Sequence, residues 1–472
     1  MRVSEPQPPY QPLGLKRTPW EHHLIVLIVL FACLSCMLPS GFDWSTDADS
    51  TVIGTGSLVY QLQWGSVFSL SALVLMRVPL RAWAHARQIN PFLWVMVVYC
   101  ILTIVWSAAP VVTLKKCIQL VGLIMLALAV QMNCKPWTHT VKTILAAIMG
   151  VELVSAVTAL AFPSLGIDAY FGYAWRGIVS NKNFFGAVSA LGVLLWVSVW
   201  NVWSVYIWVR WPGLLFSAVC VMLSTSSTSL AIAIVGPGAF FMLRRRHVGS
   251  KLWLLRIVVT LAIVVVLFAH GFFIFEGHFP SRVDLFSPFA SLFGKSADLT
   301  GRTDIWDPLL LEIDRHWLQG VGYNAFWLGK GSASQSILDT LNWVPFQGHN
   351  GYLDMLNELG VIGIVLFVSV VLAHIYALNQ LMAYDRDAAA LFSAILLITL
   401  VSNLTESSLF RGINLEFYLF VLCSVTVTSS LYQRRYGSGV AQDSGTPAQT
   451  PASVPARLAH PAHSPQVPRQ HP

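Results

Sequence analysis

The sequence predicts an all-α, polytopic membrane protein of about twelve transmembrane helices, with one long periplasmic loop that contains short helices. The chain has 472 residues, of which 55% are hydrophobic and only 11% are charged. Its mean hydropathy is +0.63. A soluble domain carries roughly a quarter charged residues, so the low charge indicates that lipid surrounds most of this chain.

Long apolar segments with short connections follow one another from Glu21 to Tyr432. A helix needs roughly 20 apolar residues to cross a bilayer. We interpret as spans residues 21–39, 57–76, 90–108, 113–132, 140–162, 184–200, 206–224, 226–243, 252–275, 352–378, 388–408 and 415–432. They form two membrane blocks, at 21–275 and 352–432, separated by the polar loop at 276–351.

The lysines and arginines predict the orientation of these spans. Cytoplasmic loops of membrane proteins carry an excess of both residues. With residues 1–20 in the cytoplasm, the clusters on that side are Lys16 and Arg17; Arg77, Arg81 and Arg87; Arg244 to Arg246; and Arg434 and Arg435. The loop 276–351 is then periplasmic and the tail 433–472 cytoplasmic. The tail is rich in Pro, Ala, Ser and Gln, which predicts disorder.

Reporter fusions test this orientation. An alkaline phosphatase fused after Thr300 is expected to be active, because the map places that position in the periplasm. The same reporter fused to the C-terminus is expected to be inactive. An inactive fusion at Thr300 or an active one at the C-terminus would invert the map and remove the outer site described below.

Neither nucleic acid nor a metal is an expected ligand, although the formal net charge is +7. A nucleic-acid interface needs lysines and arginines on one water-exposed face, whereas here they flank apolar spans. The cysteines fall in or beside spans and none lies in 276–349. The pairs Asp47 with Asp49 and Asp385 with Asp387 could hold a divalent cation, but short acidic loops are common. We therefore expect no metal and no other cofactor.

Two polar segments on the predicted outer side contain candidate site residues. Residues 163–183 form a cationic and aromatic stretch with Tyr170, Tyr173, Trp175, Arg176, Lys182 and Asn183. In the long loop, apolar residues recur at helical spacing: Ile305, Trp306, Leu309, Leu310 and Ile313. With Thr303 as a cap and Gly320 beyond the end, this spacing predicts an amphipathic helix on the membrane surface. Arg302 would lie near its first turn.

His349 stands in a third outer segment, where the loop enters the next apolar helix. The positive partial charge of a helix N-terminus favours a neutral imidazole, the form that a general base needs. Taken alone, His349 also fits a helix cap, and Arg176, Arg302 and Lys182 also fit anchors for lipid headgroups. Glu152 lies inside a predicted span. A charged side chain is costly to place in lipid, so Glu152 is a functional-site candidate unless a polar partner in the bundle satisfies it.

Several short motifs, taken together and in order, resemble the O-antigen ligase and polysaccharide polymerase superfamily. They are Trp106-Ser107 with Pro110 and Thr113-Leu114-Lys115; Trp175-Arg176-Gly177 with Asn181-Lys182-Asn183; Gly301-Arg302 with Ile305-Trp306; Gly320-Val321-Gly322-Tyr323; and His349-Asn350-Gly351-Tyr352 with Glu358-Leu359-Gly360. The W-R-G and N-K-N pair is closest to the exopolysaccharide polymerase branch. The resemblance spans about residues 100–430.

The resemblance implies a metal-independent glycosyltransferase of the bacterial inner membrane whose active site faces the periplasm. Its donor would be a glycan on undecaprenyl pyrophosphate and its acceptor a sugar hydroxyl. The implied roles are a catalytic base, His349; pyrophosphate-binding cations, Arg176, Arg302 and Lys182; and substrate-binding residues, Trp175, Asn183, Tyr323 and Asn350. Whether Arg282, Arg315 or Arg411 supplies a further arginine stays open.

An exopolysaccharide or O-antigen polymerase, which extends a lipid-linked repeat unit, is the first expectation. An O-antigen ligase, whose acceptor is lipid A-core, is the alternative. A flippase or transporter of lipid-linked glycans would instead use intramembrane charges such as Glu152. A nucleotide-sugar transferase would need Asp385, Asp387 and a metal in inner loops that are short for a nucleotide pocket. Expected partners are the lipid-linked donor, a glycan or lipid-linked acceptor and the bilayer, with room for polysaccharide assembly proteins.

Overall fold

A computed structural model describes residues 19–39, 57–133, 137–169, 172–199, 207–245, 302–341 and 345–443 of the chain. Helices make up most of these residues, and the two strands among them form one short antiparallel hairpin. The all-α class predicted from the sequence is therefore confirmed. The predicted span 252–275 lies outside the described residues.

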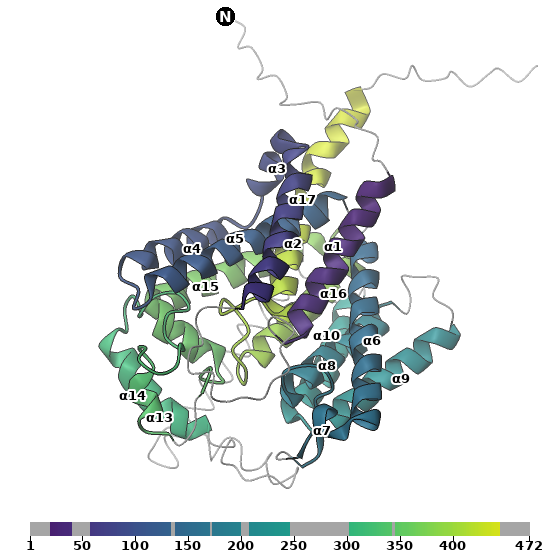
Figure 1. The fold of residues 1–472 in the computed structure, drawn as a ribbon. Helices are drawn as coiled ribbons and strands as arrows, with labels where there is room; N and C mark the ends of the chain where they lie inside the picture. Colours follow the sequence, from purple (N-terminus) through teal and green to yellow (C-terminus); the bar gives the residue numbers. More distant parts are fainter. Residues whose placement is uncertain are drawn as a thin grey trace, which may run out of the picture.

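The helices follow the predicted apolar segments in order (Figure 1). Before the hairpin lie α1 (Pro19–Met37), α2 (Leu58–Met76), α3 (Pro79–Ala86), α4 (Pro91–Leu102) with the 3-10 turn η2 (Thr103–Val105), α5 (Pro110–Asn133), α6 (Trp137–Ala161) and α7 (Pro163–Gly166). The hairpin strands are β1 (Ile167–Asp168) and β2 (Ala174–Trp175). After it come α8 (Lys182–Ser198), α9 (Ile207–Leu223), α10 (Ser227–Arg244), α13 (Arg302–Arg315), α14 (Gln335–Leu338), α15 (Gly351–Leu381), α16 (Arg386–Ser402) and α17 (Leu415–Asp443).

The length and apolarity of these helices fit a multi-pass membrane protein. Among the described residues, 6 helices are long and apolar enough to cross a bilayer, namely α2, α5, α6, α10, α15 and α17. A 7th span results if α3 and α4, which are bent by 96° at their junction, count as one. Helices α8 and α9 are apolar but shorter. The total of about twelve spans stays a prediction.

Figure 1 shows the two predicted sides at opposite ends of the bundle. Helix α3 and the end of α17, both on the predicted cytoplasmic side, lie at the top of the view, whereas α7, α13 and α14 lie toward the bottom. The prediction that the tail is disordered from residue 433 is wrong for its first part, because α17 continues to Asp443. Gln and Arg, which occupy positions 433–435, are good helix formers. Residues 444–472 lie outside the described part of the chain.

Helix α13 forms where the apolar spacing predicted a helix, but its surroundings differ from the prediction. Thr303 is not its cap, since the helix begins at Arg302. Its apolar face is covered by protein: Ile305, Trp306, Leu309 and Ile313 pack in a cluster with Val321, Phe326, Trp327 and Ile337. Leu310 stays exposed. The helix and the loop residues around 321–337 therefore form a small hydrophobic core that is separate from the main core.

Helix α15 is broken at Gly360, where φ is 65° and ψ is −171°. The segment after α13 closes this break with main-chain hydrogen bonds on both sides. The N–H groups of Val321 and Gly322 donate to the carbonyls of Asn357 and Glu358 (3.0 and 2.9 Å), and those of Val361 and Ile362 donate to Trp317 and Leu318 (2.8 and 3.2 Å). Backbone groups that the broken helix would leave unpaired are satisfied in this way. We call this arrangement the α15 joint.

The α15 joint depends on glycines at two facing positions. A Cβ on Gly320 would lie 2.3 Å from the carbonyl carbon of Glu358, and one on Gly360 would lie 2.2 Å from the carbonyl oxygen of Leu318. Both glycines also have positive φ, which other residues adopt only at a cost. The sequence motifs around Gly320 and Gly360 thus owe their glycines to one structural contact.

Candidate functional site

His349 lies in the turn that leads into α15, two residues before the helix begins. Its φ of 50° is left-handed, a conformation that few non-glycine residues adopt. The next residue, Asn350, is the N-cap of α15, and its Oδ1 accepts from the N–H groups of Tyr352 and Leu353 (3.1 and 3.2 Å). Asn350 therefore has a capping role, because its side-chain oxygen is used by the helix. Its predicted substrate-binding role stays a prediction.

The imidazole of His349 faces the carboxylate of Glu406, which follows α16. Nδ1 of His349 lies 3.3 Å from Oε2 of Glu406. The amide of Gln347 lies beside both, donating to Oε2 at 2.7 Å and lying 3.2 Å from Nδ1. Asn183, at the start of α8, donates to the other oxygen, Oε1, at 2.9 Å. The carboxylate of Glu406 thus connects the start of α8 and the segment after α16 to the turn that carries His349.

The contact with Glu406 favours one tautomer of His349, and the amide of Gln347 is compatible with it because Nε2 of Gln347 can donate to Glu406 instead of to Nδ1. A carboxylate accepts hydrogen bonds and donates none, so Nδ1 carries the proton when it bonds Glu406. The lone pair is then on Nε2. Nε2 receives no hydrogen bond from the part of the chain that the structure describes, and the side chain is 27% exposed. The ring can therefore accept a proton at Nε2 while Glu406 stabilises the imidazolium that forms.

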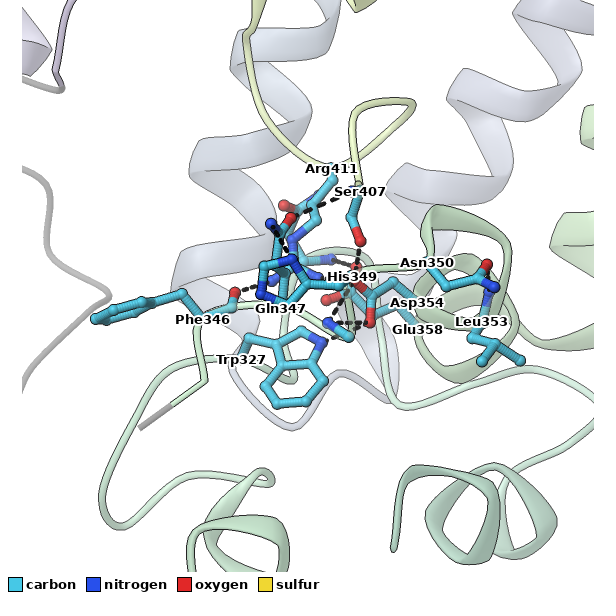
Figure 2. Close-up of polar contacts among 12 residues, drawn as sticks. Trp327, Phe346, Gln347, His349, Asn350, Leu353, Asp354, Glu358, Ser407 and Arg411 are labelled. Atoms are coloured by element: carbon cyan, nitrogen blue, oxygen red, sulfur yellow. Dashed lines mark hydrogen bonds and ion pairs between the residues drawn. The ribbon is translucent and has the colours of Figure 1, made fainter. Parts of the chain in front are cut away.

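A second carboxylate, that of Asp354 in the first turn of α15, fixes the turn that carries His349 (Figure 2). It is 3% exposed and pairs with Arg411 at 2.5 Å. Its other donors are Trp327 Nε1 at 2.7 Å, Ser407 Oγ at 2.5 Å and the N–H of Gly348 at 3.0 Å. Arg411 also donates to the carbonyl of Phe346 at 2.5 Å. The residues on both sides of Gln347 are thus tied to one buried ion pair.

Arg302, predicted to bind pyrophosphate, is the first residue of α13, and its side chain lies outside what the structure describes. One turn later, Trp306 donates from Nε1 to the carbonyl of Gly348 at 2.6 Å. The start of α13 is therefore attached to the residue before His349. Arg315, at the other end of this helix, pairs with Glu312 at 2.6 Å. Of the arginines left open, Arg411 is the one beside His349, and Arg282 is outside the described residues.

The outer segment at 163–183 is organised around the β1–β2 hairpin. Arg176 follows β2, and its Nε donates to the carbonyl of Leu165 at 3.0 Å. Trp175 is half-buried against the main core, and Lys182 is the first residue of α8. Asn183 is connected to His349 through Glu406. Arg176 is held by its own hairpin.

Tyr323, predicted to stack on a sugar, is 2% exposed, so its ring offers no face to a ligand in this conformation. Its N–H donates to Thr103 Oγ1 at 3.1 Å, and its carbonyl accepts from Thr113 Oγ1 at 2.9 Å. Burial raises the pKa of its hydroxyl well above the ordinary value. Tyr323 therefore secures the loop to η2 and α5 next to the α15 joint.

The other charged candidates have partners. Glu152 is fully buried, and its Oε2 accepts from Ser217 Oγ at 2.8 Å. Asp385 caps α16 and accepts from Trp137 Nε1 at 3.0 Å, while Asp387 pairs with Arg244 at 2.5 Å. Asp47 and Asp49 lie outside the described residues. Within the described ranges, no group of three His, Cys, Asp or Glu side chains is arranged to hold a metal ion.

A polar cavity of about 240 Å³ lies next to the Glu406 network. Its walls come from the ends of α1, α2, α8, α10, α16 and α17 that face the predicted outer side. Its lining includes Glu406 and Gln347, the two side chains that contact Nδ1 of His349. A ligand in this cavity would therefore touch the residues that orient the imidazole.

Two comparisons with known proteins find similarity, and one of them covers this part of the chain. A family model described as O-antigen ligase (Wzy_C) matches residues 212–368. That range contains His349, Asp354 and both sides of the α15 joint. The exopolysaccharide production protein ExoQ of Rhizobium meliloti (strain 1021) is 26% identical to the chain over 312 residues. This match covers 63% of the chain and 67% of ExoQ.

Proposed function

The chain belongs to the O-antigen ligase and polysaccharide polymerase superfamily of membrane proteins, and on that premise we propose a specific reaction for it. The protein transfers a glycan from undecaprenyl pyrophosphate to a hydroxyl of an acceptor sugar at the periplasmic face of the inner membrane. The acceptor is another lipid-linked repeat unit, so the product is a longer exopolysaccharide or O-antigen chain. Similarity to ExoQ supports this choice over ligation to lipid A-core.

The pairing of His349 with Glu406 is the observation that carries the proposal. The acceptor hydroxyl approaches Nε2, its oxygen forms a bond to the anomeric carbon of the donor, and its proton passes to Nε2. The bond between that carbon and the pyrophosphate oxygen breaks, and its electron pair leaves with the pyrophosphate. Glu406 stabilises the imidazolium through Nδ1, in the way that a buried carboxylate supports a catalytic histidine in hydrolases.

The departing pyrophosphate needs permanent positive charge, and Arg176, Arg302 and Lys182 are proposed to supply it. A guanidinium binds phosphate oxygens through paired hydrogen bonds. The attachment of α13 to Gly348 through Trp306 supports a place for Arg302 near the reacting atoms. Asn183 and Trp175 are proposed to contact the sugars, since Asn183 bonds Glu406 and Trp175 lies in strand β2 of the outer hairpin.

Replacing Glu406 with glutamine is expected to lower kcat about 10²-fold or more, because an amide no longer selects the reactive tautomer or stabilises the imidazolium. Steady-state kinetics on purified protein give kcat and KM separately, and KM for the donor should change little. Glu406→Asp should recover part of the rate. The matched control is Glu312→Gln, whose carboxylate pairs with Arg315 on α13. Unchanged kcat in Glu406→Gln would remove Glu406 from the mechanism.

Transfer by the purified protein in lipid nanodiscs tests the function itself. Lipid-linked repeat units extracted from producing cells serve as donor and acceptor, with chelator in excess. A ladder of longer lipid-linked chains is expected. A single product on added lipid A-core would identify a ligase. Movement of intact donor across vesicle membranes without any transfer would contradict the proposal and identify a flippase.

A further inference from the structure

The cavity beside Glu406 has a composition that selects for one kind of ligand. Hydroxyl groups line much of it, from Ser180, Ser226, Thr228, Ser229, Thr405 and Ser408. Amides come from Asn181, Asn183 and Asn414, and carboxylates from Glu406 and Glu416. No lysine or arginine belongs to this described lining. An anionic pyrophosphate in the cavity would lie against two carboxylates, whereas a neutral polyol would find both donors and acceptors.

Aromatic and size features of the cavity agree with a sugar. Tyr60 and Phe184 stand in the wall, and an aromatic ring gives an apolar face against which the C–H side of a sugar can pack. The volume of 240 Å³ corresponds to roughly eight waters at about 30 Å³ each. That is room for at least one sugar ring.

We infer that this cavity is a binding site for a single uncharged sugar residue of the glycan, next to the reacting hydroxyl and separate from the pyrophosphate site. The inference rests on the proposed function for the identity of the glycan. Glu406 belongs to both sites, since it lines the cavity and contacts His349 Nδ1. A sugar in the cavity therefore lies one side chain away from the base, where it can select the acceptor or the donor glycan.

Binding measurements without any donor lipid test the cavity directly. The probe is a reducing oligosaccharide of the repeat unit, released from the polymer that producing cells make, and binding to the full-length protein is followed by saturation-transfer NMR. Glu416→Gln and Thr228→Val each remove one polar group of the lining, and about tenfold weaker binding is expected for Glu416→Gln and several-fold for Thr228→Val. Thr143→Val, on the exposed face of α6 outside the cavity, is the matched control.

The outcomes separate this inference from the proposed function. Weaker binding in both cavity variants, with thermal stability and the control unchanged, supports the sugar site even if the protein transfers nothing. Equal binding in all three variants overturns it, as does displacement of the oligosaccharide by inorganic pyrophosphate. In the transfer assay, a KM raised for the acceptor assigns the cavity to the acceptor glycan, and a KM raised for the donor assigns it to the donor glycan.

Discussion

Replacing His349 with alanine is expected to lower the single-turnover rate of glycan transfer by about 10²- to 10⁴-fold, the range typical of a lost general base. Binding of the lipid-linked donor should persist, because in the proposed mechanism the imidazole acts on the acceptor hydroxyl and cations hold the pyrophosphate. Rapid-quench transfer and donor binding by the purified variant measure the two effects separately. The division of labour proposed for the site depends on this separation.

Two variants serve as controls for this experiment. His316→Ala removes an exposed histidine beyond the end of α13 and should leave the rate unchanged. Arg176→Lys keeps the charge but loses the planar fork of donors, so donor binding should weaken in this variant. Near-normal turnover in His349→Ala, or loss of donor binding as complete as in the arginine variant, would show that His349 is not the base.

Replacing Asp354 with alanine is expected to destabilise the protein by about 3–5 kcal/mol, the usual cost of breaking a buried ion pair from one side. The loss leaves Arg411 with 16% exposure and without its carboxylate, and it frees the N–H of Gly348. Transfer activity should fall as well, because the turn that holds His349 loses its anchor. Thermal unfolding in detergent, followed by tryptophan fluorescence, measures the loss of stability.

The double variant Asp354→Ala with Arg411→Met is expected to recover part of the lost stability, since it removes the unpaired charge. It should not recover the activity, because the N–H of Gly348 and the carbonyl of Phe346 both lose their side-chain partners. Asp314→Ala, at an exposed position on α13, is the control and should change the unfolding midpoint little. An unfolding midpoint for Asp354→Ala equal to that of the control would contradict the structural role assigned to this pair.

The helices were predictable from the sequence because their signal is local. Apolar runs of span length gave the bounds of α2, α5, α6, α10 and α15 to within three residues, and helical spacing of apolar residues gave α13. The contacts between helices are not local, so the sequence did not predict the break in α15 or the covering of the apolar face of α13. Both depend on segments that meet through main-chain groups, which carry no residue-specific pattern.

The site was predictable only in part. His349 and Asn183 were singled out, but Glu406, Asp354 and Gln347 were not. The predicted spans 388–408 and 352–378 contained Glu406 and Asp354 respectively, and an ionisable residue inside a span is a site candidate by default. Applied to Glu152 alone, that rule selected a carboxylate whose Oε2 accepts from Ser217 and whose Oε1 is buried without a hydrogen bond from the described residues. Applied to every span, it would have included both carboxylates that hold the His349 turn.

The α15 joint has a consequence for the depth of the protein in the bilayer. As one straight helix, α15 would carry Asp354 and Glu358 into hydrocarbon, where an aspartate at the centre of a span costs about 2.5–3.5 kcal/mol. The part after the break, residues 361–381, is already about 30 Å long, which matches the thickness of the hydrocarbon core. Membrane insertion can thus begin at Val361. The nine residues before Gly360 then lie on the water side of the membrane and carry the His349 turn. The position of Gly360 in the helix therefore sets the distance of that turn from the lipid.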